Sequence, residues 1–499
     1  MSVSASPSAP SRRARRARAA VAAVFLTNGA LFANVIPRYP QIKADLGVSN
    51  ALLGAALAAF PLGALLAGLF AAAAIRRLGS ARVAAGGIVA VAVTTLAIPL
   101  AAHWIVLAAV LAVIGALDAI VDVAQNAHGL RVQRLYRRSI VNSFHGVWSI
   151  GAVLGGLMGS AAAGLDVPLA VHLAVSAALF SLVALGALRF LLPGAEDAER
   201  ATRAQDLAAA SGDHPAAPPA RHGGTRTVAG HAVRMLAALG VLAACGALVE
   251  DAGASWGALY LSGDLRTGAA TAGLAFVALQ VAMTIGRLTG DRVVDRFGQR
   301  TVVRAGGVLT GVGMGAALAL PTLPTALAGF ALAGLGVATL VPAAMHTADE
   351  LPGLAPGTGL TVVSWLLRGG FLLSPPLVGA VADLTSLRAG LLSVVVAGTL
   401  TAILARVLAP GAATRPPPGH EDRGAPAGPA PGHEDRGAPA GPAPGHEDRG
   451  APARQAPDHE DRGAPARPAP GPGPGEPDGA ATPAPVSPGR PGSGPGDRP

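Results

Sequence analysis

The sequence predicts an all-α polytopic membrane protein with twelve transmembrane helices and a disordered C-terminal tail. Of the 499 residues, 51% are hydrophobic and only 13% are charged, against about 25% charged in an ordinary soluble domain. A transmembrane helix needs about 20 mainly apolar residues to cross about 30 Å of hydrocarbon. Each half of the chain contains six such stretches, and a polar segment separates the halves. These observations argue against a soluble enzyme.

The apolar stretches define two sets of six expected spans. Gly and Pro occur within several of them, which membrane helices tolerate because neighbouring helices pack closely and satisfy the freed backbone groups. The expected spans are 19–40, 51–74, 83–102, 104–128, 140–164 and 168–192 in the first half, and 234–262, 268–290, 301–320, 324–347, 357–383 and 386–408 in the second.

Polar segments set the expected domain boundaries. A basic arm (1–18) precedes the first six-helix bundle (19–192), a central loop (193–233) leads to the second bundle (234–409), and a tail (410–499) follows. The tail is rich in Pro and Gly and repeats a 13-residue unit, and four successive repeats each carry one histidine, at His420, His433, His446 and His459. Such sequence buries too little apolar surface to offset the entropy of ordering, so we interpret it as a disordered spacer. The sequence predicts no metal site and no cofactor.

The distribution of arginines predicts the topology. Residues 1–409 carry 29 Lys and Arg against 17 Asp and Glu. Of the 29, our assignment places 24 on one side and four on the other, and leaves Arg368 inside a span. The positive-inside rule then puts both termini and the central loop in the cytoplasm, with the chain in the plasma (inner) membrane. The positive charge is thereby explained without nucleic acid. The single cysteine, Cys245, excludes an intrachain disulfide.

A charged loop follows the predicted eighth span and has a weaker counterpart after the second. The loop after the eighth span has the sequence GDRVVDRFGQR, in which an acid at a helix end lies beside arginines. We expect these charges to form a contact that breaks when one bundle rocks against the other. The alternative is that these charges only set the topology. In the first copy, IRRLGSAR, Arg76 occupies the place that Asp295 holds in the second copy. The residues of the second copy expected to act in gating are Gly290, Asp291, Arg292, Asp295, Arg296, Gly298 and Arg300.

Two six-helix halves with these loops resemble the major facilitator superfamily of secondary transporters. The stretches 122–129, 143–149 and 256–261 further resemble a branch of poorly characterised bacterial inner-membrane permeases, distantly similar to fucose-type proton symporters. That branch usually has an acid just before the tryptophan where this chain has Ser255. The resemblance implies a monomer in the lipid bilayer that moves a small molecule by alternating access, with the first, fourth, seventh and tenth helices lining a central cavity.

Polar side chains inside the spans are the candidates for function, because a charge in the membrane needs a partner, a water-filled cavity or a role. Asp118 and Asp122 lie on one face of the fourth span, and Glu250 and Asp251 lie in the seventh. A carboxyl group in hydrocarbon favours its neutral form and can therefore gain and lose a proton. Our proton-coupling candidates are Asp122, Glu250, Asp118 and His145. The alternative is that the acids pair with Arg368, or that the histidine only packs.

Amide and aromatic side chains suit the binding of a hydroxylated solute, through hydrogen bonds and flat apolar contacts. Tryptophans near span ends have an alternative role as interface anchors, and Arg368 has the alternatives of binding an anion or neutralising an acid. The candidates for the substrate cavity are Asn28, Asn126, Asn142, Trp148, Trp256, Tyr260, Gln280, His346 and Arg368.

Three functions remain open from the sequence. The first is proton-coupled transport of a small polar solute. The second is proton-antiport efflux of a drug or metabolite, although Ala152 occupies the proline position of the motif that efflux members carry in the fifth helix. The third is a membrane sensor or scaffold whose tail recruits partners. The chain has no phosphate-binding loop and no catalytic spacing, so we do not expect an enzyme.

Overall fold

The computed structural model describes residues 11–136, 140–194, 226–351, 354 and 357–408. Throughout these residues the regular structure is helical. Twelve helical segments are long and apolar enough to cross a membrane, which confirms the predicted all-α, twelve-span fold. The predicted tail (410–499) and most of the predicted central loop lie outside the described residues.

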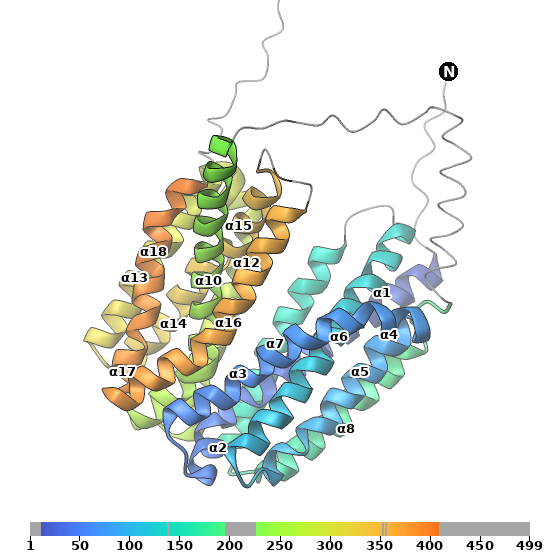
Figure 1. The fold of residues 1–499 in the computed structure, drawn as a ribbon. Helices are drawn as coiled ribbons and strands as arrows, with labels where there is room; N and C mark the ends of the chain where they lie inside the picture. The colour runs from blue at the N-terminus through green and yellow to red at the C-terminus, as the bar shows by residue number, and fades with distance from the viewer. Residues whose placement is uncertain (1–10, 137–139, 195–225, 352–353, 355–356, 409–499) are drawn as a thin grey trace, which may run out of the picture. The chain divides into compact units, whose positions relative to one another are not determined.

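The first six spans form one bundle (Figure 1). Its helices are α1 (Arg12–Asn34), η1 (Ile36–Arg38), α2 (Tyr39–Leu46), α3 (Asn50–Ala67), η2 (Gly68–Phe70), α4 (Ala71–Leu78), α5 (Ser80–Thr95), η3 (Ile98–Leu100), α6 (Trp104–Tyr136), α7 (Val141–Gly164) and α8 (Leu169–Leu188).

The last six spans form the second bundle. Its helices are α10 (Arg226–Gly263), α11 (Ala269–Ala272), α12 (Leu274–Phe297), α13 (Gln299–Ala319), α14 (Leu323–Val337), α15 (Leu340–Asp349), α16 (Thr358–Leu384), α17 (Leu387–Gly390), α18 (Leu392–Leu404) and η4 (Ala405–Val407).

Several helices are longer than the apolar stretches that predict them. Helix α1 begins at Arg12, inside the predicted basic arm, and α6 continues to Tyr136, eight residues beyond the predicted end at 128. Helix α10 begins at Arg226, within the predicted central loop. Alanine and arginine are good helix formers, so the helix continues past the hydrocarbon boundary where composition alone places its end.

Glycines bring α1 and α7 into backbone contact. Gly151, Gly155 and Gly159 recur every four residues on α7, and a Cβ added to any of them would lie 2.1 to 2.3 Å from a backbone oxygen of α1. Real Cβ atoms do not approach this closely, so the two helices can only pack at this distance if these positions lack side chains. The neighbouring Gly156 faces away from α1, because a Cβ there would meet Phe276 of the second bundle at 2.9 Å.

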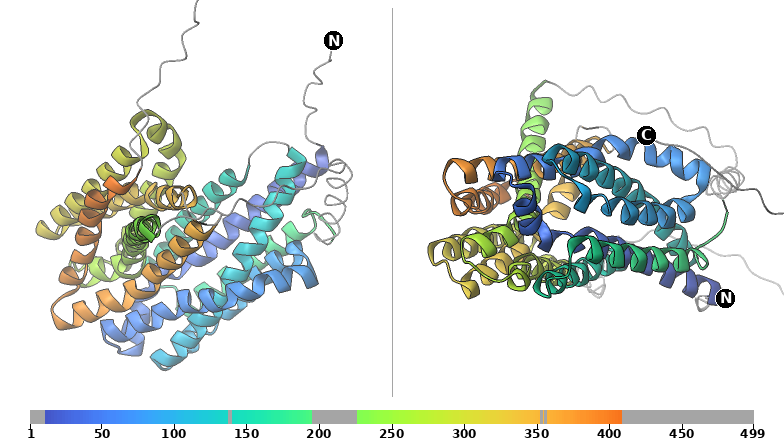
Figure 2. Two further views of the ribbon diagram at one scale, coloured as in Figure 1. Left: turned by 45° about the horizontal axis from the view of Figure 1, so that its top comes forward. Right: turned by 90° about the horizontal axis from the view of Figure 1, so that it is seen from below.

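The two bundles meet along two seams. Helix α3 packs on α16, and α7 packs on α12, with further contacts from α10 and α11 to η1. Figure 2 shows helices of both bundles side by side at the end viewed from below. We call this the outer end, where α3 begins and α16 finishes, and the opposite end, where α1 begins and α6 finishes, the inner end.

Candidate functional site

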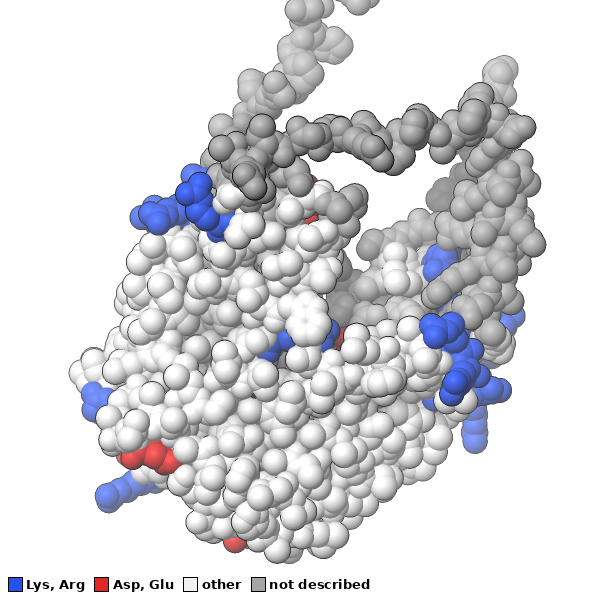
Figure 3. All heavy atoms as spheres, in the orientation of Figure 1, with Lys and Arg blue, Asp and Glu red and all other residues white. Residues whose placement is uncertain are grey.

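A central cavity of about 340 Å³ lies between the two bundles. In Figure 3 a recess between the bundles contains both basic and acidic atoms. The first, second, fourth, seventh and eleventh spans all contribute to the cavity wall. The tenth span contributes none of its lining residues, so the expectation that the first, fourth, seventh and tenth helices line it is wrong for the tenth. The polar lining residues include Asn28, Tyr39, Asp118, Trp148, Glu250, Asp251, Ser255, Gln280 and Arg368.

Three side chains of the first bundle form a hydrogen-bonded chain at this cavity. Trp148 Nε1 on α7 donates to Asn28 Oδ1 on α1 at 2.7 Å, and Asn28 Nδ2 donates to Asp118 Oδ1 on α6 at 2.8 Å. The two bonds fix the Asn28 amide, because its oxygen accepts from one neighbour and its nitrogen donates to the other. Asp118 is thereby held on the cavity wall by residues of two other helices.

Two adjacent carboxyl groups of α10 have different environments. Glu250 Oε2 lies 3.2 Å from Arg287 Nη2 on α12, in an ion pair whose side chains are 26% and 39% exposed. Asp251 Oδ1 accepts from Ser255 Oγ at 3.1 Å, and its Oδ2 is buried without a hydrogen-bond partner among the described residues. An ionised carboxylate with an unpartnered buried oxygen is costly. Of the two, Asp251 is therefore the one whose surroundings suit a neutral carboxyl.

A second cavity, of about 520 Å³, extends from the first toward the inner end. It shares Ala64, Asp118 and Arg368 with the central cavity and adds Asp122, which lies one helical turn further along α6. Arg368 is exposed in this space and makes no ion pair with any residue that the structure describes. The predicted pairing of Arg368 with Asp122 or Glu250 is therefore absent among the described residues. Glu250 is paired with Arg287, and Asp122 accepts from Gln125 and Asn126 of its own helix.

Other sequence-predicted residues of the first bundle lie around these cavities. Asp122 accepts from Asn126 Nδ2 on its own helix at 3.0 Å. His145 is exposed, with its ring 5.4 Å from that of Phe25 in an edge-on contact. The side chain of Asn142 lies outside the described residues. Asp122 thus lines the inner part of the space, whereas Asn126 and His145 are not among the lining residues.

In the second bundle the predicted residues divide between cavity and core. Gln280 lines the central cavity, and its Nε2 is buried with no partner among the described residues. Trp256 and Tyr260 are fully buried and line neither cavity. A Cβ added to Gly379 would lie 3.0 Å from the Trp256 ring, so this tryptophan packs against α16. Trp256 is thus placed as a packing residue.

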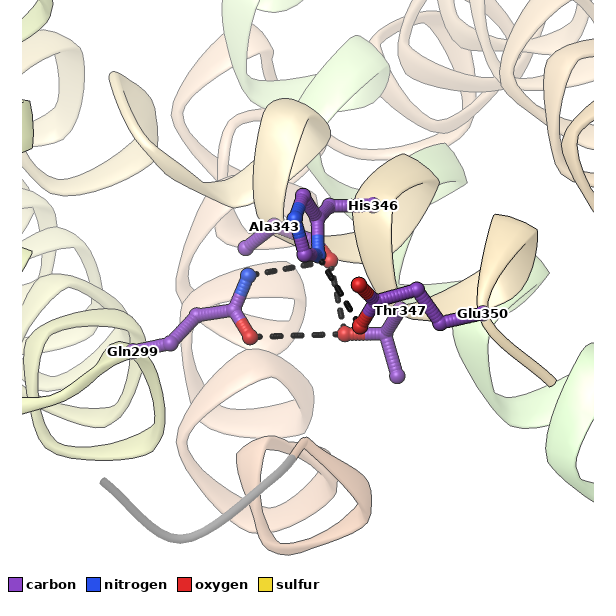
Figure 4. Close-up of polar contacts among 5 residues, drawn as sticks. All are labelled: Gln299, Ala343, His346, Thr347 and Glu350. Atoms are coloured by element: carbon purple, nitrogen blue, oxygen red, sulfur yellow. Dashed lines mark hydrogen bonds and ion pairs between the residues drawn. The ribbon is translucent and has the colours of Figure 1, made fainter. Parts of the chain in front are cut away.

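His346 lies away from the cavity, at the inner end of α15. Figure 4 shows it beside Glu350, with His346 Nδ1 3.5 Å from Glu350 Oε2 and both side chains exposed. Next to this pair, Gln299 Nε2 donates to the backbone oxygen of Ala343 at 3.2 Å, and Thr347 Oγ1 donates to Gln299 Oε1 at 3.4 Å. The charged loop is thereby attached to α15 through Gln299.

The predicted gating loop joins α12 to α13. Gly298 adopts a positive φ of 78°, which allows the sharp turn between the two helices. Arg300 Nε donates to the backbone oxygen of Leu408 at 2.9 Å, which ties the loop to the end of the twelfth span. Asp291 and Asp295 are exposed, and neither forms an ion pair with an arginine of the described loop. The remaining loop residues, Gly290, Arg292 and Arg296, lie at the inner end of α12.

Sequence reasoning missed several residues of the site. Arg287 falls inside the predicted eighth span, yet the charge count did not place it there. Its signal was available, because an arginine within a predicted span requires a partner. Tyr39, Phe32 and Phe60 also line the cavity, and their apolar neighbours gave no signal that separated them from residues facing lipid.

Comparison with known proteins identifies the family. The model of the major facilitator superfamily matches residues 21–250 and 236–456. The chain belongs to the major facilitator superfamily. An uncharacterised transporter of Sinorhizobium fredii is 30% identical over 77% of this chain and 96% of its own. An uncharacterised transporter of this superfamily from Yersinia pestis is 26% identical over 73% of this chain and 88% of its own.

Solved structures of superfamily members share the fold. The nucleoside transporter NupG matches with a TM-score of 0.58 and 13% identity, over 79% of this chain and 98% of its own. A D-xylose-proton symporter matches with a TM-score of 0.58 and 14% identity, over 79% and 96%. A bacterial homologue of the human lysosomal transporter Spinster, in an inward-facing and unoccupied conformation, matches with a TM-score of 0.58 and 16% identity, over 80% and 98%. The family match, the relatives in sequence and the twelve apolar helices together show that the chain is a multi-pass membrane transporter.

Proposed function

We propose that this transporter moves a small polar solute across the plasma membrane by alternating access, coupled to protons. The observation that carries the proposal is the pair of carboxyl groups on opposite walls of one cavity, Asp118 from the first bundle and Asp251 from the second. Each faces the space that a solute would occupy. A carboxyl that changes its protonation when the cavity changes sides couples the proton to the solute.

The arrangement of the cavity supports a small polar solute. Asn28 and Gln280 supply amide groups, and aromatic side chains such as Phe32, Phe60 and Trp148 supply flat apolar faces. A volume of about 340 Å³ lies within the range of small-molecule sites.

Charge and contacts support one orientation. The basic residues of the α1 start, the α6 end and the α12–α13 loop gather at the inner end, which the positive-inside rule assigns to the cytoplasm. The two cavities continue toward that end, whereas α3 and α16 are in contact at the outer end. We therefore propose that this conformation is open toward the cytoplasm, with both termini cytoplasmic.

The test is transport by purified protein in proteoliposomes with an imposed pH gradient. A panel of sugars, nucleosides and amino acids would be offered as radiolabelled solutes, with gradient and orientation reversed in separate vesicles. We expect accumulation of at least one solute that follows the proton gradient and collapses with a protonophore. Solute flux that ignores the gradient would contradict proton coupling, and absence of any flux across the panel would contradict the proposed substrate class.

The aromatic lining also suits an amphipathic solute, which keeps proton-antiport efflux as a second candidate. The two directions differ in the sign of coupling. A symported solute accumulates on the side to which protons flow, and an antiported one on the opposite side. The same vesicles therefore separate uptake from efflux.

A further inference from the structure

The carboxylate of Asp383, near the end of α16, caps the first turn of α3 in the other bundle. Its Oδ1 accepts from the backbone N–H and from the side-chain Nδ2 of Asn50, each at 2.9 Å. Its Oδ2 accepts from the backbone N–H of Ala51 at 2.7 Å. One side chain of the second bundle thus makes three hydrogen bonds to the first.

These bonds complete the N-terminus of α3. The first four N–H groups of an α-helix have no partner within the helix. Here Leu52 N donates to Ser49 Oγ within the same bundle, and the regular helical bonds begin with Leu53 N donating to Ser49 O. Two more of the four, those of Asn50 and Ala51, donate to Asp383. A negative charge at this place also interacts favourably with the helix dipole.

The helices around this cap are in backbone contact. A Cβ added to Gly379 would lie 2.4 Å from the backbone oxygen of Asn50, and one added to Gly54 would lie 2.4 Å from that of Pro375. The α3 and α16 backbones are therefore packed directly against each other beside the cap. Separation of the two helices at the outer end requires all three bonds to break.

Among the residues that the structure describes, no acid at the inner end caps a helix of the other bundle. In the loop after the second span, Arg76 occupies the position where the loop after the eighth span has Asp295. The acids Asp291 and Asp295 form no ion pair with the loop arginines, within the part of the chain that the structure describes. A charged contact between the bundles is therefore present at the outer end and absent from these residues at the inner end.

We propose that Asp383 is the positioning residue of the outer gate, and that its cap on α3 biases the resting protein toward the conformation closed at the outer end. The inference rests on the proposed alternating-access cycle. It adds the residue that sets the equilibrium between the conformations closed and open at the outer end when no solute is bound. Loss of a helix cap and of a charge at a helix N-terminus corresponds to about a three- to thirtyfold change in the ratio of the conformation closed at the outer end to the one open there. The contact is exposed, so the effect weakens as ionic strength rises.

The test measures access to the central cavity from each side of the membrane. Cys245 is the only cysteine, so a Cys245→Ala background with Ala254→Cys, at a residue lining the cavity, gives a single reporter thiol. Its labelling by a membrane-impermeant maleimide is measured in right-side-out and in inside-out vesicles. Asp383→Asn is expected to raise outer labelling by about three- to thirtyfold and to lower inner labelling.

Two further variants serve as controls. Asp45→Asn removes an exposed acid from the same end, on α2, and is expected to leave both labelling rates unchanged. Asp383→Glu retains the charge and is expected to restore most of the outer closure. Unchanged outer labelling in Asp383→Asn, or an equal rise on both sides that signals a loosened fold, would overturn the proposal.

The readout needs neither substrate nor gradient. A failure of the proposed solute or of proton coupling would leave the labelling result standing, so the two proposals fail separately. If Asp383→Asn does not insert into the membrane, Asn50→Ala removes only one of the three bonds. It is expected to shift labelling in the same direction by a smaller factor, and the absence of that shift would count against the cap.

Discussion

Replacement of Asp118 by asparagine tests the proposed proton coupling while preserving the shape of the site. Asn28 Nδ2 donates to Asp118 Oδ1 at 2.8 Å, and an asparagine at position 118 offers an oxygen in the same place. The contact between α1 and α6 is therefore retained in the variant. We expect the free energy of unfolding to change by about 1 kcal/mol or less, the net worth of a single hydrogen bond.

The effect on accumulation is much larger. A gradient of one pH unit stores about 1.4 kcal/mol per proton, which supports about tenfold accumulation of a neutral solute when one proton accompanies each molecule. An asparagine cannot carry the proton, so the expected accumulation ratio of Asp118→Asn is about one. Exchange of labelled for unlabelled solute, which needs no net proton movement, is expected to continue.

The assay is gradient-driven uptake beside counterflow in the same proteoliposomes. Asp122→Asn is the comparison variant, since this carboxyl lies one turn further along α6 and bonds to amides of its own helix. Retained tenfold accumulation in Asp118→Asn would refute the assignment of the proton to Asp118. Loss of both accumulation and exchange would show that the residue acts in binding or folding, and loss of accumulation only in Asp122→Asn would move the proton site to that residue.

Further predictions concern stability and the tail. Glu250→Gln and Arg287→Ala are each expected to lower the free energy of unfolding by about 1 kcal/mol or less, because the ion pair is partly exposed. A double-mutant cycle measured by denaturant unfolding checks this. Additive losses in the double variant would contradict a direct interaction between the two side chains. Gly155→Ala is expected to lower the midpoint of thermal unfolding by several degrees, because the added Cβ would lie 2.1 Å from a backbone oxygen. Gly186→Ala is the control, since a Cβ added there would have no atom within 4 Å. Equal midpoints for the two variants would refute the packing argument. Deletion of residues 410–499 is expected to leave initial transport rates within about twofold of the full chain, and a larger loss at equal membrane abundance would assign the tail a part in transport.

The fold could be predicted from the sequence because one physical requirement dominates it. A segment that crosses hydrocarbon must be apolar over about 20 residues, and this requirement is visible without knowing the neighbours. The glycines of the fifth span were likewise visible, and three of them bring α7 against α1. The ends of α1, α6 and α10 were not visible, because helical hydrogen bonding continues into polar residues that composition assigns to loops.

The site was predicted only in part, because spacing along one helix does not give its rotation against another. The position of Asp118 and Asp122 on one face of α6 follows from the helical period. That Glu250 pairs with Arg287 depends on how α10 and α12 pack, and the separation of Arg368 from the described acids depends on how α16 packs. Trp256 illustrates the same limit, since this aromatic residue directly follows the cavity residue Ser255 and yet packs into the core.

Helix α7 combines two mechanical roles in consecutive residues. Gly155 faces α1, a neighbour in the same bundle, while Gly156 faces Phe276 across the boundary between bundles. If the bundles rock as rigid bodies, the first contact travels with the helix and the second slides. The contact at Gly155 then stays fixed during transport while the contact at Gly156 changes, so substitutions at these two glycines are expected to separate folding from turnover.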